Sequence, residues 1–300
     1  MAKEQLKLDL AESIKRLKIM TNQIVNTSLV GGYKSVFKGR GMEFYDYRKY
    51  TPNDDAATID WKASVRSSQL LVREFVDERN LNVYFLIDVS SSMVYSSTDK
   101  LKIEYVGEIA AALSFVVLNA GDSVGYALFN DHVTKNAYPA QGLVQYHNLV
   151  RTLATPDNYG GKYDLNEALK FTLASLKQAS VVILISDFIG LKNDWEKYVK
   201  MLSKKFDLIG IMVRDPRDRA LPDYDGQVIL EDPFSNRQVL VRPEKIKDDY
   251  ANYVAREERA IKNIFLNAGA DFLELATNES FVKPLTNLFI YRAKKSGRRL

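Results

Sequence analysis

The chain has 300 residues, of which 46% are hydrophobic and 27% are charged, and its formal net charge is +4. This is the composition of an ordinary globular protein with one large domain or two modest ones. The chain contains no cysteine, which excludes disulfides, thiol catalysis and a cysteine-ligated zinc.

Two features argue against a membrane or nucleic-acid protein. Charges are scattered through residues 1–20, where a signal peptide would be apolar, and the most apolar run, 109–118, is far shorter than the roughly 20 residues of a membrane span. Basic residues bunch only at 292–299, which is more typical of a solvated terminus than of a binding arm. We therefore expect a cytoplasmic protein with no direct membrane insertion and no nucleic-acid partner.

The first 80 residues differ in pattern from the rest of the chain. Apolar residues between positions 4 and 26 have helical spacing. Glycines and Pro52 divide residues 30–80 into short stretches, which predicts turns and short strands. We treat residues 1–80 as an N-terminal segment, 81–293 as one domain and 294–300 as a basic tail.

From residue 81 onward, apolar segments of strand length alternate with segments of helical periodicity. We predict strands at 83–87, 122–129, 133–138, 180–185, 206–213 and 271–275, and helices at 100–119, 143–153, 165–177, 195–204, 244–267 and 281–293. This alternation indicates a doubly wound α/β fold with a mostly parallel sheet that is covered on both faces. Asn130-Asp131 would join an antiparallel edge pair, and the polar stretch near 216–245 reads as an insertion.

An Asp-x-Ser-x-Ser motif follows the first of these strands, at Asp88, Ser90 and Ser92. Alternate residues of an extended turn point the same way, so a carboxylate and two hydroxyls can converge on one point. Three oxygen donors suit a hard cation such as Mg²⁺, with Mn²⁺ or Ca²⁺ as alternatives. Asp and Ser also favour turns and helix caps, so the motif alone is equally typical of a loop that enters a helix.

Two further polar loops are expected at the same edge of the sheet. Asp187 follows the strand at 180–185, and the loop 160–165 enters a helix. Ligands of doubly wound sheets bind outside the carboxyl ends of the strands, where the strand order reverses. Together these features resemble the metal-ion-dependent adhesion site of von Willebrand factor A domains, and the resemblance spans 81–215 and continues to about 293.

This resemblance implies a function. In such a site Asp88, Ser90 and Ser92 would contact the cation directly and Asp187 would contact it through water. An Asp or Glu of a partner protein would then complete the coordination, so the domain would recognise proteins rather than catalyse a reaction.

The loop 160–165 departs from the pattern of the resembled site. That loop usually reads Gly-Gly-Thr-Asp-Leu, whereas Tyr163 stands here in place of the threonine ligand. Tyr163 and Asp164 are therefore further candidate ligands. Packing or shielding accounts better for a bulky phenol, and a helix cap together with Glu167 accounts better for Asp164.

The segment before the sheet domain carries three motifs, at 39–44, 48–55 and 59–62. They resemble a bacterial family of unknown biochemical function that joins such a segment to a von Willebrand factor A-like domain. Genes of that family commonly lie beside one for a MoxR-type AAA+ ATPase, which implies this ATPase or its client as the partner. The charged residues of the segment could form a ligand site, but we favour an ion-pair network that holds the segment to the sheet domain: Arg40, Glu43, Arg48, Asp54, Asp55, Asp60 and Arg66.

Two other functions are weighed against a metal-dependent interaction module. A metal-assisted hydrolase would need a general base, and His132 and His147 fall in a turn and on a helix rather than at the strand ends. No phosphate-binding loop and no nucleophile elbow is present in the sequence. A structural adaptor with a degenerate metal site is the second alternative, and Tyr163 favours it. We expect a protein that is not an enzyme.

Overall fold

The structure is a computed structural model, and it describes residues 33, 43–52, 54–76, 81–177 and 180–295. The amphipathic segment predicted at 4–26 and the end of the basic tail lie outside these residues. In the described part of the chain, no helix combines the length and the apolar character needed to cross a membrane.

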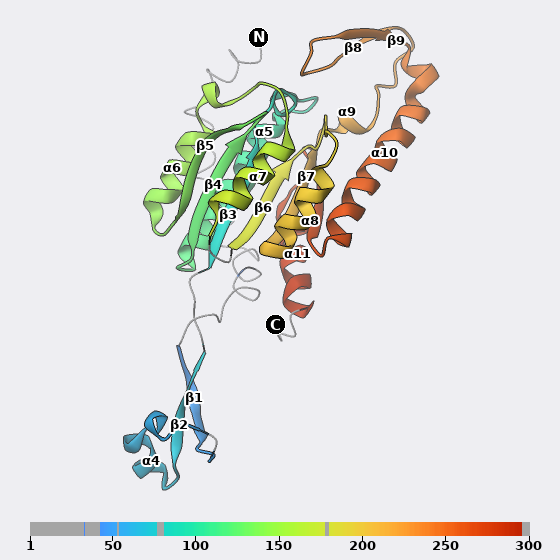
Figure 1. Cartoon of the computed structure of the whole chain (residues 1–300). Coiled ribbons are helices and arrows are strands. Elements are labelled where there is room, and N and C mark those ends of the chain that lie inside the picture. Colours follow the sequence, from blue (N-terminus) through green and yellow to red (C-terminus); the bar gives the residue numbers. More distant parts are fainter. Residues whose placement is uncertain (1–32, 34–42, 53, 77–80, 178–179, 296–300) are drawn as a thin grey trace.

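A six-stranded sheet forms the centre of the molecule, in the order β10-β7-β6-β3-β4-β5 (Figure 1). Its strands are β3 (Asn82–Asp88), β4 (Ser123–Phe129), β5 (Val133–Ala140), β6 (Ser180–Ser186), β7 (Asp207–Arg214) and β10 (Asp271–Ala276). Neighbours pair in parallel except β4 and β5, which form the predicted antiparallel edge. The order reverses between β3 and β6, which places the switch point at their carboxyl ends.

Helices cover both faces of this sheet, as predicted. One face carries α5 (Lys102–Asn119), α6 (Leu143–Leu153) and α11 (Val282–Lys295), and the other carries α7 (Leu165–Ser175), α8 (Trp195–Lys205) and α10 (Pro243–Asn267). Strand β3 shows the underlying pattern, because Phe85 and Ile87 pack on the first face and Tyr84 and Leu86 on the second. Burying each such side chain contributes about 1.5–3 kcal/mol relative to exposing it.

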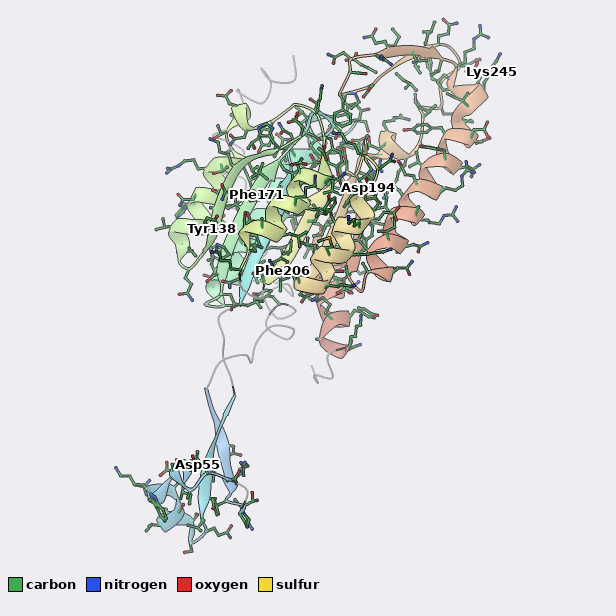
Figure 2. The ribbon with its side chains drawn as sticks, in the orientation of Figure 1. Asp55, Tyr138, Phe171, Asp194, Phe206 and Lys245 are labelled. Atoms are coloured by element: carbon green, nitrogen blue, oxygen red, sulfur yellow. The ribbon has the colours of Figure 1, made fainter. Side chains whose placement is uncertain are left out.

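Helix α8 shows how the connections run back along the sheet. Figure 2 labels Asp194 and Phe206, which flank α8 at its two ends. Strand β7 begins directly after Phe206, so the start of α8 lies at the opposite edge of the sheet, at the carboxyl end of β6. The loop between β6 and α8 therefore lies at the switch point.

The insertion predicted near 216–245 is present. It contains the short helix α9 (Pro216–Arg219) and a hairpin formed by β8 (Val228–Glu231) and β9 (Gln238–Val241). Figure 1 shows the hairpin beyond the edge of the sheet, between α9 and α10. The insertion is therefore a structured addition placed next to the switch point.

Within the N-terminal segment, the described residues between 43 and 76 form a small unit, whereas Tyr33 is buried in the core of the sheet domain. Strands β1 (Glu43–Lys49) and β2 (Leu71–Val76) pair in antiparallel fashion, and α4 (Trp61–Ser67) lies between them in the sequence. The short strands were predicted, but α4 was not. It begins there because the Asp60 carboxylate accepts hydrogen bonds from the backbone N–H groups of Lys62 and Ala63.

The charged residues of this unit hold the unit itself together. Arg48 donates to Asp54 at 2.5 and 2.6 Å, and Asp54 also accepts from the Thr51 N–H at 2.9 Å. Asp55 caps a short 3-10 helix, as Asp60 caps α4. Of the expected network, the described contacts are an internal ion pair and two helix caps. Arg40 lies outside the described residues, and the attachment of the segment to the sheet domain stays a prediction.

The contact between β4 and β5 leaves no room for a side chain at Gly125. An added Cβ would lie 2.7 Å from the Pro139 backbone nitrogen and 2.8 Å from a Tyr84 ring carbon. Because a backbone atom cannot move cheaply, we expect Gly125→Ala to lower the free energy of unfolding in urea by about 1–3 kcal/mol. Gly107→Ala on α5 is the control, because its Cβ would meet nothing within 4 Å. Equal effects of the two substitutions would contradict this description.

Candidate functional site

Asp88, the last residue of β3, is fully buried, and donors of the protein hold its carboxylate. Its Oδ1 accepts a hydrogen bond from the Ser90 backbone N–H at 2.9 Å, and its Oδ2 accepts one from the Ser186 hydroxyl at 2.6 Å. Ser186 is the last residue of β6. The carboxylate therefore lies between the two strands that flank the switch point.

The two serines of the motif lie beside this carboxylate. The Ser90 and Ser92 hydroxyl oxygens are 3.2 Å apart, and both residues are buried. The structure thus brings together Asp88, Ser90 and Ser92.

The loop at 160–161 is joined to the motif through the backbone. Ser91 N–H donates to the Gly161 carbonyl and the Gly161 N–H donates to the Ser91 hydroxyl, both at 3.0 Å. Gly160 N–H donates to the Val89 carbonyl at 2.8 Å. Gly160 and Gly161 have φ values of 102° and 95°, a region that side chains disfavour, so this close approach requires glycine.

Asp187 follows β6 and is also fully buried. Its Oδ1 accepts from the Ile189 N–H at 2.9 Å, and its Oδ2 accepts from the Lys102 ammonium at 2.7 Å. Lys102, the first residue of α5, is 1% exposed and donates a second hydrogen bond to Asp218 of α9 at 2.9 Å. An ammonium group therefore links the end of β6 to the insertion.

The end of β7 adds further charged side chains next to this group. β7 ends at Arg214, and the Asp215 that follows is fully buried. Asp215 accepts hydrogen bonds from Ser97 and from the Arg217 N–H, and its own N–H donates to Asp218 at 2.9 Å. The Arg214 guanidinium lies 3.5 Å from Glu257 and 3.7 Å from Glu258 of α10.

Burial and mutual charge set the pKa values of this cluster. Burial and the nearby Asp187 raise the pKa of Asp88 well above its usual range. Burial also opposes ionisation of Asp187, but the Lys102 ammonium and the Arg214 guanidinium outweigh it and hold the Asp187 pKa below its usual range. The acidic partners of Lys102 likewise overcome its burial and raise its pKa. Asp187 and Lys102 thus form a charged pair inside the protein.

Tyr163 lies against the same residues. It is 3% exposed, and its hydroxyl is 3.1 Å from the Ser186 hydroxyl oxygen. The single Ser186 proton is donated to Asp88, so the Tyr163 hydroxyl is the donor in this contact. The Tyr163 ring packs on Phe129, with centroids 6.0 Å apart, and on Phe234 at 6.4 Å.

Asp164, the other further candidate, caps α7. Its carboxylate accepts from the Asn166 N–H at 3.0 Å and from the Lys192 ammonium at 2.6 Å. The helix cap is therefore present, but the predicted partner Glu167 pairs with Lys170 instead. Asp164 therefore serves as a helix cap, and both of its carboxylate oxygens accept hydrogen bonds from protein groups.

The two histidines lie on the surface. His132 follows β4 in the turn to β5, and its ring nitrogen is 2.7 Å from Asp131. His147 is an exposed residue of α6. The printed contact of the His132 ring is thus with the neighbouring Asp131 and not with Asp88, Ser186 or Asp187.

Phe234, at the tip of the β8–β9 hairpin, stacks on the Tyr163 ring and occupies the space next to Gly190. The two rings are inclined by 24°, and a Cβ added to Gly190 would lie 2.8 Å from the Phe234 ring. We expect Phe234→Ala to remove about 0.5–1.5 kcal/mol of contact energy and to speed amide hydrogen exchange at 188–192 and 232–237. Val239→Ala, at an exposed position of β9, is the control. Unchanged exchange at 188–192 in the Phe234 variant would contradict this packing.

The fit of a divalent cation can be judged from the donors present. Two ligands in neighbouring positions of an octahedral Mg²⁺ shell are about 3 Å apart, close to the 3.2 Å between the Ser90 and Ser92 hydroxyl oxygens. With Asp88 beside them, the donors are the oxygens that Mg²⁺ prefers. No cluster of three or more carboxylate, histidine or cysteine side chains suited to a metal occurs in the described ranges, since hydroxyls supply two of the three donors here. These donors are thus of the kind that a hard cation takes, but both Asp88 oxygens accept hydrogen bonds from protein groups and Asp187 is already paired with Lys102.

The sequence matches a known family over most of its length. Residues 46–260 match the family described as "Protein of unknown function DUF58". The chain belongs to this family. An uncharacterised protein of Mycobacterium bovis is 26% identical over 289 residues, which cover 95% of this chain and 90% of that protein. The uncharacterised protein YeaD of Bacillus subtilis is 31% identical over 126 residues, which cover 42% of this DUF58 chain and 29% of YeaD.

Solved structures similar to this DUF58 member include proteins of the von Willebrand factor A type. BatB from Bacteroides thetaiotaomicron is 15% identical, with a TM-score of 0.47 over 72% of this chain and 100% of that one. A von Willebrand factor type A protein from Catenulispora acidiphila is 14% identical, with a TM-score of 0.37 over 48% of this chain and 35% of that one. Proximal thread matrix protein 1 from the mussel byssus is described with a zinc-occupied MIDAS motif. It is 17% identical, with a TM-score of 0.37 over 45% of this chain and 38% of that one.

Proposed function

We propose that this member of DUF58 is a protein-interaction module that binds a partner through a divalent cation. Asp88, Ser90 and Ser92 would hold the ion, which we expect to be Mg²⁺, with Mn²⁺ or Ca²⁺ as alternatives. The observation that carries this proposal is the convergence of one carboxylate and two hydroxyls at the switch point of the sheet, with the hydroxyl oxygens 3.2 Å apart.

The donor set determines what such an ion would do. One direct carboxylate cannot neutralise a divalent cation, so the ion keeps positive charge and favours a further anionic ligand. An Asp or Glu side chain of a partner supplies that ligand, and Asp187 assists through water. The chain's own contribution is to bind and orient, and we propose that it is not an enzyme.

Burial sets a condition on this interaction. Asp88 and Ser90 have no exposed surface and Ser92 is 2% exposed. A partner carboxylate therefore reaches the ion only after neighbouring side chains move. We propose that Phe234 is the side chain that moves, because it belongs to a short hairpin whose strands are largely exposed and it stacks on the Tyr163 ring.

For the partner we propose a MoxR-type AAA+ ATPase or a client of such an ATPase. The support is the resemblance of the motifs at 39–44, 48–55 and 59–62 to the bacterial family described above. In this arrangement the ATPase hydrolyses the nucleotide and this DUF58 member recognises protein.

A titration with Mn²⁺ tests the cation. We expect Asp88→Asn to weaken Mn²⁺ binding to the purified protein, measured by calorimetry, by more than about tenfold. Loss of a residue that only supports a metal ligand already weakens binding by about 10–100-fold. Asp131→Asn, at a carboxylate in the β4–β5 turn, is the control. Equal Mn²⁺ binding by folded wild type and Asp88→Asn would refute the cation site.

The partner is tested by binding the purified protein to the MoxR-type ATPase of the same organism. We expect the complex to form with Mg²⁺, to dissociate with a chelator and to be lost in Asp88→Asn. A complex that survives both the chelator and the substitution would show that the interaction does not use this site.

A second candidate function is that of an adaptor whose cation site has been replaced by protein groups. The specific observation in its favour is the buried Lys102–Asp187 pair, together with Tyr163 in the threonine position. This adaptor would bind its partner equally well with and without a divalent cation.

A further inference from the structure

Lys102 is buried beside the proposed cation site. Its side chain is 1% exposed, and its ammonium donates to Asp187 at 2.7 Å and to Asp218 at 2.9 Å. The ammonium nitrogen also lies 5.8 Å from the centre of the Tyr95 ring. These contacts attach the first turn of α5 to the end of β6 and to the insertion.

The position of this charge is difficult to explain by stability alone. Burying an ammonium removes its hydration, and attraction to a partner often only balances that cost. Apolar side chains in place of the whole group of Lys102 and its acids would fill the same space without that cost. The charge does, however, lie where it acts on the site, because Asp187 contacts Lys102 directly and also interacts electrostatically with Asp88 and Tyr163.

Acidic side chains outnumber basic ones around Lys102. Asp88, Asp187, Asp215 and Asp218 bring four carboxylates to the ends of β3, β6 and β7. Lys102 and Arg214 face them, and Arg214 also lies near Glu257 and Glu258. Of these residues the buried acids are Asp88, Asp187 and Asp215, which outnumber the buried bases Lys102 and Arg214 by one, so a divalent ion would compete with Lys102 for the same negative charge.

We propose that Lys102 is a tethered cation that competes with the divalent ion for Asp187 and thereby sets the metal affinity of the site. The inference rests on the cation site proposed above and adds the residue that tunes it. Asp218 gives the ammonium a second partner, so Lys102 can release Asp187 to the hydrated ion while it keeps its bond to α9. Binding of the ion would in this way be communicated to the insertion that carries Phe234.

The test compares Mn²⁺ binding by wild type and Lys102→Met, measured by calorimetry and by the electron paramagnetic resonance signal of free Mn²⁺. Removing a positive charge from a buried site should strengthen binding by more than about tenfold. Lys100→Met is the matched control, because it removes the same charge two residues earlier, where the lysine pairs with Glu108 at 2.7 Å. A merely structural role of Lys102 would weaken folding but would not raise the affinity for Mn²⁺.

The outcomes separate this inference from the proposed function. Tighter Mn²⁺ binding by Lys102→Met, but not by Lys100→Met, supports the inference. If wild type itself binds no Mn²⁺ while Lys102→Met does, the cation-dependent function fails and the inference stands. Equal binding by wild type and Lys102→Met overturns the inference and leaves the function intact. No binding by either protein overturns both.

A second variant keeps the test decisive if Lys102→Met does not fold. Lys102→Met combined with Asp218→Asn removes one lysine and one of its two acids, so less uncompensated charge remains buried. This variant should also bind Mn²⁺ more tightly than wild type, and its melting temperature should rise more with Mn²⁺. A rise no larger than that of wild type would overturn the inference.

Discussion

Replacing Phe265 by alanine is expected to lower the free energy of unfolding by about 3–5 kcal/mol. Phe265 of α10 is fully buried, and its ring contacts those of Phe188, Trp195 and Phe272, with centroids 4.9–6.2 Å apart. An added Cβ at Gly210 would lie 2.7 Å from this ring, so α10 packs closely on β7. The loss is a large part of the roughly 5–15 kcal/mol that stabilises a typical domain.

The same aromatic cluster supports the candidate site. Phe188 directly follows Asp187 and has a φ of 54°, a backbone conformation that costs a residue with a side chain on the order of 1–3 kcal/mol. Contacts with Phe265 and Phe272 hold it there. Phe265→Ala should therefore also weaken Mn²⁺ binding, although the substituted side chain is not a ligand.

Urea unfolding followed by circular dichroism measures this effect, and Leu266→Ala is the control. Leu266 is the next residue of α10 and is 48% exposed, so its truncation should cost less than about 1 kcal/mol. Similar losses in the two variants would show that α10 does not pack on the sheet through Phe265.

Removing Lys102 is expected to have the second large effect on stability. In the presence of a chelator, Lys102→Met should cost about 3–5 kcal/mol, because it leaves Asp187 and Asp218 without their ammonium in a buried place. Asp187→Asn should cost less. In that variant Lys102 keeps Asp218, and the loss of the Asp187 charge relieves its repulsion with Asp88.

The measurement is the free energy of unfolding of these two variants in urea, which shows which of them loses more. Lys170→Met, which breaks the exposed pair with Glu167, serves as the control and should cost less than about 1 kcal/mol. A loss in Lys102→Met no greater than in the control would show that the buried pair carries no specific interaction. If Asp187→Asn lost more unfolding free energy than Lys102→Met, the description of Lys102 as the shared partner of two buried acids would be wrong.

Much of the sheet domain could be predicted because its strands are buried on both faces. In β3 and β6 every position from 83 to 87 and from 181 to 185 is buried, so each strand is visible as a continuous apolar run in the sequence. Helix α4 was missed because it is only seven residues long and its signal is one capping residue, Asp60. The β8–β9 hairpin was seen only as a polar interruption, because its short strands bury little.

The candidate site could be predicted only where residues follow strands. Asp88, Ser90 and Ser92 stand directly after one apolar strand and Asp187 after another, and the same rule applied to β7 would have found Asp215. Lys102 and Phe234 carry no such signal. They reach the site from the start of a helix and the tip of a hairpin, and only the folded chain brings these to the sheet edge.

The most direct test of the cation site is a crystal of the protein grown with Mn²⁺ and measured at the manganese absorption edge. We predict an anomalous peak about 2.0–2.6 Å from side-chain oxygens of Asp88, Ser90 and Ser92, the range of Mg²⁺ and Ca²⁺ ligand distances, and no such peak in crystals of Asp88→Asn. A map with no peak there, in which the Asp88 carboxylate keeps its hydrogen bonds to Ser90 and Ser186, would contradict the proposal.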